Sequence, residues 1–153
     1  IAINTAIVQN PNLINEIANR FGSQCLVASI EAKFDPNMKQ WNVLTDCARE
    51  VTNLEVIKWA KRCESMGAGE ILLTSVDQEG TRKGFDVELA SAVTSEVNIP
   101  VIVSGGFGVK NHILDISKLP IDALAFADSL HFKRYSMTEI KTFSKEAGLE
   151  VRL

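Results

Sequence analysis

Short apolar runs alternate with amphipathic segments of helical period along this chain, and the alternation restricts the folds open to it. The runs are rich in Val and Ile and apolar on both faces, as in parallel strands that are covered on both sides. Repeated strand and helix units of about 30 residues predict parallel strands joined by right-handed crossovers, and therefore an α/β fold. The expected strands are 1–5, 25–30, 71–75, 101–104 and 123–127.

The segments between these runs carry signals for helix starts and ends. Ser, Thr and Asp side chains cap free N–H groups at a helix N-terminus, and glycine commonly ends a helix. The expected helices are 11–21 with Gly22 as terminator, one that opens at the capping box 52–55, one that follows Asp86 as N-cap, and one that opens at the capping box 136–139 and ends at Gly148.

Composition and charge narrow the function classes. The 153 residues are 46% hydrophobic and 23% charged, as expected for one globular domain. A formal net charge of −3 with interspersed signs gives no field that would favour nucleic acid or an anionic membrane. Three cysteines without Cys-x-x-Cys spacing argue against disulfides and zinc and favour a reducing cytosol. Neither His112 nor His131 has metal-ligand spacing, so no metal and no cofactor are expected.

Periodicity alone does not choose between an open doubly wound sheet and a (β/α)8 barrel. No Gly-x-Gly-x-x-Gly follows the first strand and no Walker loop is present, so the common nucleotide-binding motifs are absent. Segment 34–51 lies outside the strand and helix pattern. Within it, 40–45 is expected to form an extra strand or a hairpin that acts as a lid over the barrel mouth.

Three groups of residues follow predicted strands, where α/β folds place their chemistry. The glycines of 104–108 permit close backbone approach to a phosphate, although a tight turn without ligand fits the same spacing. Segment 77–81 contains acidic groups and a glycine, which would suit a binding site. A solvated turn without ligand fits the same residues. Glu31 places a carboxylate at a strand end, where surface residues are also common.

Several longer stretches resemble one family closely. They are Ile-Asn-Thr-Ala at 3–6, Arg-Phe-Gly-Ser-Gln at 20–24, Gly-Ala-Gly-Glu-Ile-Leu-Leu-Thr-Ser at 67–75, Ser-Gly-Gly at 104–106 and Val-Arg-Leu at 151–153. The chain resembles the cyclase subunit of imidazole glycerol phosphate synthase. The resemblance implies the C-terminal half of a (β/α)8 barrel, with residues 1–153 as a single half-barrel domain that carries strands four to eight.

The resemblance also implies substrate-binding residues for a substrate with a phosphate at either end. In the family each half of the barrel holds one phosphate. Asp128 stands where the family usually offers serine, and a carboxylate there would repel a phosphate. The implied phosphate-binding residues are Asn4 and Thr5 for the site that belongs mostly to the other half, and Gly80, Gly106, Ala127 and Asp128 for the site of this half.

Catalysis in the family uses two aspartates as acid and base, one from each half. The counterpart here is Glu31, and Glu79 occupies a second acidic position where Asp is usual. Both side chains are one methylene longer than Asp, a change that catalytic geometry need not tolerate. Thr74 and Ser104 match polar positions near the reacting groups. His131 also matches a family position but is expected to be structural, as is His112 on a helix surface.

The implied function is the cyclase reaction of histidine biosynthesis. Ammonia from a glutaminase partner would convert a bis-phosphorylated ribulosyl intermediate to imidazole glycerol phosphate and aminoimidazole carboxamide ribotide. Segments 78–86 and 127–134 look instead like paralogous subunits that deliver ammonia to a sugar-amidating enzyme of surface-polysaccharide biosynthesis. A third possibility is a phosphate-binding half-barrel that is inactive by itself and self-associates. A related sugar isomerase fits less well, because 67–77 resembles the cyclase.

Overall fold

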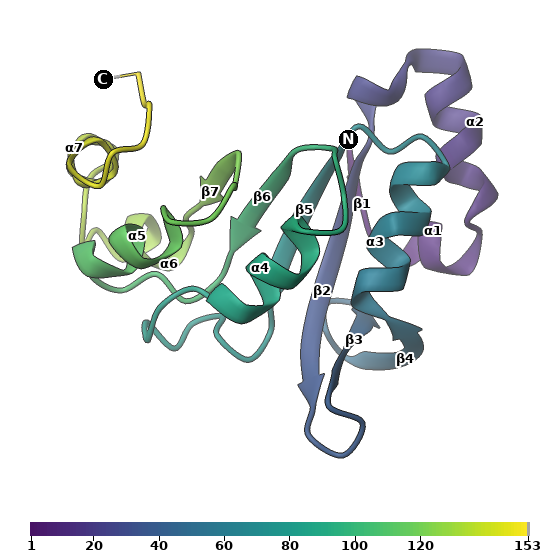
Figure 1. Cartoon of the computed structure of the whole chain (residues 1–153), viewed down its shortest axis with the longest axis horizontal. Coiled ribbons are helices and arrows are strands. Elements are labelled where there is room, and N and C mark those ends of the chain that lie inside the picture. Colours follow the sequence, from purple (N-terminus) through teal and green to yellow (C-terminus); the bar gives the residue numbers. More distant parts are fainter. Residues whose placement is uncertain (153) are drawn as a thin grey trace.

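The computed structural model describes residues 1–152, so Leu153, the last residue of the closing motif, lies outside the described part. Strands and helices alternate along the chain (Figure 1). In chain order the elements are β1 Ala2–Ile3, α1 Thr5–Gln9, α2 Asn12–Phe21, η1 Ser23–Cys25, β2 Val27–Asp35, β3 Gln40–Thr45, β4 Glu50–Glu55, α3 Val56–Ser65, β5 Glu70–Ser75, α4 Val87–Thr94, β6 Val101–Ser104, α5 Lys110–Ile116, β7 Ala123–Ala125, α6 Asp128–His131 and α7 Met137–Glu146.

The seven strands form one sheet. Strands β1, β2, β5, β6 and β7 are parallel, and each pairs with the next of these along the chain. A doubly wound sheet reverses its strand order at a switch point, whereas a barrel adds strands in sequence order. The order therefore confirms the α/β class with the strand arrangement of half a (β/α)8 barrel, and it rules out the doubly wound alternative.

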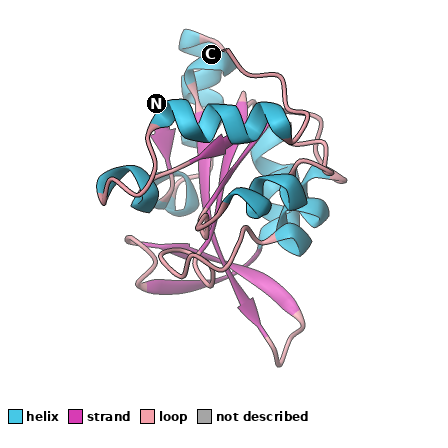
Figure 2. Cartoon of the chain, turned by 90° about the vertical axis from the view of Figure 1, so that its left-hand side faces the viewer, coloured by secondary structure: helices cyan, strands magenta, loops and turns pink. Residues whose placement is uncertain are grey.

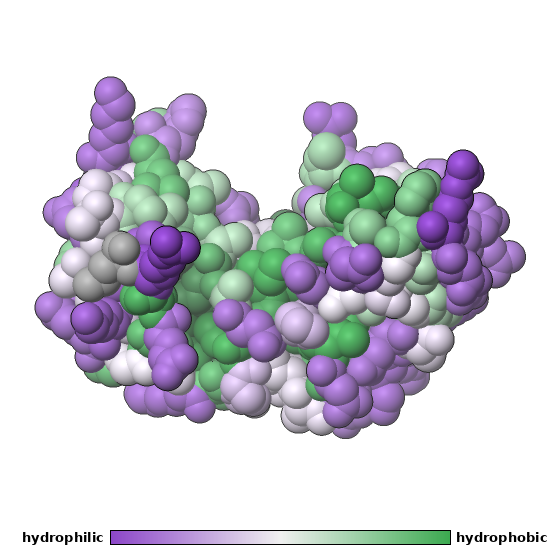
Figure 3. All heavy atoms as spheres, turned by 90° about the horizontal axis from the view of Figure 1, so that it is seen from above, coloured by the Kyte–Doolittle hydropathy of each residue, from purple (hydrophilic) through white to green (hydrophobic). Residues whose placement is uncertain are grey.

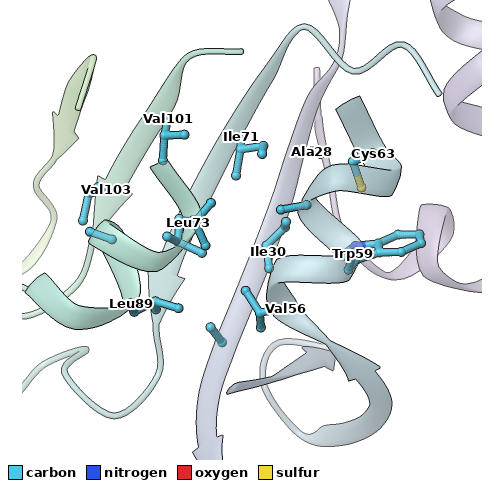
Figure 4. Close-up of a cluster of buried hydrophobic side chains, with 14 of the residues drawn as sticks. Ala28, Ile30, Val56, Trp59, Cys63, Ile71, Leu73, Leu89, Val101 and Val103 are labelled. Atoms are coloured by element: carbon cyan, nitrogen blue, oxygen red, sulfur yellow. The ribbon is translucent and has the colours of Figure 1, made fainter. Parts of the chain in front are cut away.

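The hydrophobic core lies between the parallel strands and the helices that cover them, with α3 and α4 over its central part. Buried Ala28, Ile30, Ile71 and Leu73 alternate along β2 and β5 with residues on the opposite face (Figure 4). They pack in one cluster with apolar side chains of the two helices, which include Val56, Trp59, Cys63 and Leu89.

The opposite face of the sheet is open. Val27, Leu72 and Ile102 point away from the buried core residues of their strands and are half-buried. Figure 3 shows the molecule hollowed between its two ends, with apolar residues exposed in the hollow. We call this the concave face.

Segment 34–51 forms the predicted hairpin. Strand β2 continues to Asp35 and pairs antiparallel with β3, which pairs antiparallel with β4. These strands extend away from the helical layer at one end of the molecule (Figure 2). The hairpin lies at the carboxyl end of β2, because β3 pairs with residues Glu31 to Asp35.

The capping box predicted at 52–55 is wrong. These residues belong to β4, where the Thr52 hydroxyl donates to the Val43 carbonyl at 2.7 Å. The backbone groups of this segment are used in the pairing of β4 with β3, so helix α3 begins only at Val56. Glu55 is its N-cap, and its carboxylate accepts hydrogen bonds from the N–H groups of Ile57 and Lys58.

The start of the chain also differs from the prediction. The first strand ends at Ile3 rather than residue 5, because the backbone turns at Asn4 into the short helix α1, which the sequence did not predict. Asp86 caps α4 as predicted, with its carboxylate accepting from Leu89 N–H at 3.0 Å.

The capping box at 136–139 is confirmed. The Ser136 side chain accepts from the Glu139 N–H, and the Glu139 carboxylate accepts from the Ser136 N–H and hydroxyl. These hydrogen bonds hold the pKa of Glu139 below its usual 4.5. Among residues 1–152, no helix has the length and apolar character needed to cross a membrane.

Candidate active site

Three polar residues form a row across the concave face, near the carboxyl ends of β5 and β6 and at the point where β2 runs on into the hairpin. Glu31 is in register with Thr74, and Thr74 is in register with Ser104. Their chain neighbours Ile30, Leu73 and Val103 are buried on the helix side, so alternation turns the three polar side chains toward the open face. Neighbouring strands lie about 4.8 Å apart, so the row is roughly 10 Å long. The structure therefore brings three predicted site residues to one edge.

Hydrogen bonds from two other segments hold the Glu31 carboxylate. Its Oε2 accepts from the Ala48 N–H at 2.8 Å and from the Asn4 side-chain amide at 3.2 Å. The same amide nitrogen also donates to the Leu44 carbonyl at 2.9 Å. No hydrogen bond to Glu31 Oε1 is found within residues 1–152. One oxygen of the carboxylate is thus anchored while the other has no protein partner.

The contact from Ala48 comes from the turn between β3 and β4. Asp46, Cys47 and Ala48 have φ angles of 54°, 58° and 60°, a left-handed conformation that costs a non-glycine residue about 1 kcal/mol or more. The Asp46 N–H also donates to the Thr5 hydroxyl at 3.0 Å. This 46–48 turn therefore joins Thr5 to Glu31, and Asn4 is added through its own hydrogen bond to Glu31. The turn places the hairpin against this end of the row, close to where the lid was predicted.

The other predicted residues gather around a separate pocket at the ends of β6 and β7. The Gly106 and Ala127 N–H groups donate to no backbone carbonyl within residues 1–152. The pocket has a free volume of about 20 Å³, roughly the space of one water molecule. Its lining includes the predicted residues Glu79, Gly80, Ser104, Gly106, Ala127 and Asp128. We call it the glycine pocket.

Gly106 has a packing role in addition to its place in the glycine pocket. Its φ is +97°, and a Cβ there would lie 1.9 Å from the Gly84 carbonyl oxygen. The Gly84 N–H donates to the Gly106 carbonyl at 2.8 Å. The fold thus requires glycine at 106 even without a ligand. Gly80 has φ +73°, and a Cβ on this residue would meet nothing within 4 Å, so it is open on that side.

Two neighbouring side chains of the glycine pocket have unused hydrogen-bonding capacity. The Asp128 carboxylate is 22% exposed, and its Oδ2 is buried and accepts no hydrogen bond. The nearest cation is the Arg134 guanidinium, whose Nε lies 3.6 Å from Oδ2. Ser129 is 2% exposed, and its hydroxyl has no partner. The sequence did not single out Ser129 or Arg134, although Ser129 is adjacent to position 128, where the resemblance implied serine.

Neither histidine lies in the polar row or lines the glycine pocket. His131 is exposed and its ring meets Phe132 edge-on. His112 is half-buried on α5, and its Nδ1 accepts from the Gly108 and Val109 N–H groups. In the described part of the chain, no group of three or more His, Cys, Asp or Glu side chains could hold a metal ion.

The predicted residues therefore form two groups on one edge of the sheet. Thr5 and Glu31 are joined through the 46–48 turn, and Asn4 bonds directly to Glu31. Glu79, Gly80, Ser104, Gly106, Ala127 and Asp128 line the glycine pocket. Thr74 lies between the groups, in register with Glu31 on one side and Ser104 on the other.

Comparison with known proteins gives a consistent result. The model of the family described as "Histidine biosynthesis protein" matches residues 1–136. The chain is 48% identical over 153 residues to the imidazole glycerol phosphate synthase subunit HisF of Pyrococcus furiosus. It is 46% identical over 154 residues to the proteins of that name from Hydrogenobaculum sp. and Clostridium botulinum strain Okra. These alignments cover all of this chain and 60% or 61% of each relative, so the chain spans about three fifths of their length.

Proposed function

Because this chain belongs to the histidine biosynthesis protein family, we propose that it supplies strands four to eight, the C-terminal half, of a cyclase barrel. The complete barrel would be the cyclase subunit of imidazole glycerol phosphate synthase. It would use ammonia from a glutaminase subunit to convert a bis-phosphorylated ribulosyl intermediate to imidazole glycerol phosphate and aminoimidazole carboxamide ribotide. Residues 1–153 would form one half-barrel domain without cyclase activity of its own, because catalysis draws on both halves.

The observation that carries this proposal is the anchored Glu31 carboxylate at the end of the polar row. Its Oε2 is fixed by Ala48 and Asn4, and its Oε1 has no protein partner in the described chain. A carboxylate held in this way can exchange a proton through the free oxygen while keeping its orientation. The anchoring hydrogen bonds also fix the side chain of glutamate, which is one methylene longer than the family's aspartate.

We assign the two substrate phosphates to the two groups of residues. Asn4 and Thr5 would contribute to one phosphate site beside Glu31. Gly80, Gly106, Ala127 and Asp128 would line the other, with the unpaired N–H groups of Gly106 and Ala127 directed to phosphate oxygens. Because the glycine pocket has the volume of about one water molecule, the phosphate would occupy its mouth. Glu79 would be the second acidic group. Thr74 and Ser104 would contact the part of the substrate that lies between its two phosphates.

A second candidate function is ammonia delivery to a sugar-amidating enzyme of surface-polysaccharide biosynthesis. It is favoured by Asp128, which places a second carboxylate beside Glu79 in the glycine pocket. Two carboxylates oppose binding of a phosphate, and an ammonia conduit would not need that phosphate.

The test is ammonia-driven product formation, without a glutaminase, by the full-length protein, by which we mean the complete barrel that contains this chain. Glu31→Gln removes the ionisable group and should lower the rate about 10²- to 10⁴-fold. Glu31→Asp restores the family residue and should retain or raise activity. Glu16→Gln on the exposed face of α2 is the matched control and should leave the rate unchanged. Equal rates for wild type and Glu31→Gln would exclude the catalytic role. Absence of cyclase activity in every variant would favour the ammonia-delivery function.

A further inference from the structure

We propose that Arg134 determines whether the glycine pocket accepts a phosphate, by neutralising the Asp128 carboxylate that lines it. The inference rests on the proposed function, because it concerns the phosphate assigned to this pocket. Glu79 and Asp128 both line the pocket, so an approaching phosphate meets two like charges. Arg134 is the cation that pairs with one of them.

The environment of Asp128 strengthens the effect of the Arg134 charge on its carboxylate. Its Oδ2 is buried, accepts no hydrogen bond and lies 3.6 Å from Arg134 Nε. A carboxylate with one buried oxygen is unfavourable without a compensating charge, and water screens its field less than it screens that of an exposed carboxylate. The guanidinium is therefore the main group that reduces the negative potential of Asp128 at the pocket.

The position of Arg134 is fixed by contacts other than the ion pair. Its backbone N–H donates to the Ser129 carbonyl at 2.8 Å, and its guanidinium carbon lies 4.7 Å from the centroid of the Phe132 ring. Among residues 1–152, Arg134 is not part of the pocket lining, whereas Asp128 and Ser129 are. Arg134 is thus a positioning residue that acts on the ligand through Asp128.

Ser129 provides an independent indication that a ligand belongs here. Ser129 is 2% exposed and lines the pocket, and its hydroxyl has no hydrogen-bond partner among residues 1–152. Buried hydroxyl groups are rarely left unpaired. A phosphate oxygen would accept from this hydroxyl, provided that the charge of Asp128 is compensated.

The experiment is an NMR titration of the full-length protein with inorganic phosphate, in which the Gly105 and Gly106 amide signals report on the pocket. Arg134→Ala should weaken phosphate binding about tenfold. Arg134→Lys keeps the positive charge and should weaken phosphate binding less than Arg134→Ala does. Asp128→Ser should bind at least as tightly as wild type. In the Asp128→Ser background, Arg134→Ala should have little further effect, because the charge that Arg134 compensates has been removed.

Arg20→Ala is the matched control. Arg20 also lies over a phenylalanine, with its guanidinium carbon 5.2 Å from the Phe21 ring centroid, but it is on α2 and not in the pocket. Equal phosphate affinities for Arg134→Ala and Arg20→Ala would overturn the role of Arg134 while leaving the phosphate site intact. If neither wild type nor Asp128→Ser shows shifts at Gly105 and Gly106, the phosphate site itself is wrong and the inference fails with it.

Discussion

Substituting alanine at Gly106 and at Gly80 separates the packing role of a pocket glycine from its conformational role. Both glycines line the same pocket and have positive φ angles, +97° and +73°. They differ in the space around them. A Cβ on Gly106 would lie 1.9 Å from the Gly84 carbonyl oxygen, whereas nothing lies within 4 Å of a Cβ on Gly80.

The expected losses follow from these differences. Both variants place alanine at positive φ, which costs about 1 to 2 kcal/mol and is offset in part by the stiffer unfolded chain. Gly80→Ala should therefore lower the free energy of unfolding by about 1 kcal/mol. Gly106→Ala adds overpacking of about 1 to 3 kcal/mol. It also strains the hydrogen bond from Gly84 N–H to the Gly106 carbonyl, worth about 1 kcal/mol. Its total loss should be about 3 to 5 kcal/mol.

Urea unfolding of the full-length protein, followed by circular dichroism, measures both values. With a slope of about 2 kcal/mol per molar urea, the midpoint should fall by about 0.5 M for Gly80→Ala and by about 1.5 to 2.5 M for Gly106→Ala. Equal losses for the two variants would refute the steric argument. They would mean that the loops of Gly84 and Gly106 move apart at little cost.

Two further predictions concern the thiols and the concave face. Burial raises the pKa of the Cys63 thiol to about 12, whereas Cys47 is exposed in the 46–48 turn. A thiol reagent at pH 8 should therefore modify Cys47 rapidly and Cys63 only after unfolding, as read by peptide mass mapping, and rapid labelling of Cys63 in the folded protein would contradict the packing of α3. The isolated chain should self-associate at micromolar concentration, because the apolar concave face and the outer edges of β1 and β7 are uncovered. Light scattering that shows a stable monomer would contradict this.

The parts of the fold that were predicted correctly depend on local patterns. Apolar runs at 71–75 and 101–104 became β5 and β6, and Asp86 caps α4, because these signals lie within one element and meet no competitor. The capping box at 52–55 failed because hairpin pairing of β4 with the adjacent strand β3 used the same residues. Helix-capping propensity gives way where a neighbouring strand forms hydrogen bonds with the same backbone groups.

Only those parts of the candidate site that depend on a particular side chain or on glycine could be predicted from the sequence. The place of Glu31 follows from its register with Thr74, and the places of Ser104 and Gly106 follow from the end of β6 and the turn after it. The hydrogen bond from the Ala48 N–H to Glu31 was not predictable, because nearly every residue type has a backbone N–H and the sequence does not show which one will donate. The pairing of Arg134 with Asp128 likewise depends on a turn of the chain after α6 that brings the two side chains together.

The sequential order of the parallel strands has a consequence for how the chain acquires its structure. Each new strand pairs with one that has already been synthesised: β2 with β1, β5 with β2, β6 with β5 and β7 with β6. Partner residues in these four pairs are separated by 21 to 43 residues of chain, so each pairing needs only the parallel strand made before it. The sheet can therefore grow by one strand at a time as the polypeptide leaves the ribosome. Pulse-labelling hydrogen exchange on stalled nascent chains should show protection that spreads from β2 toward β7.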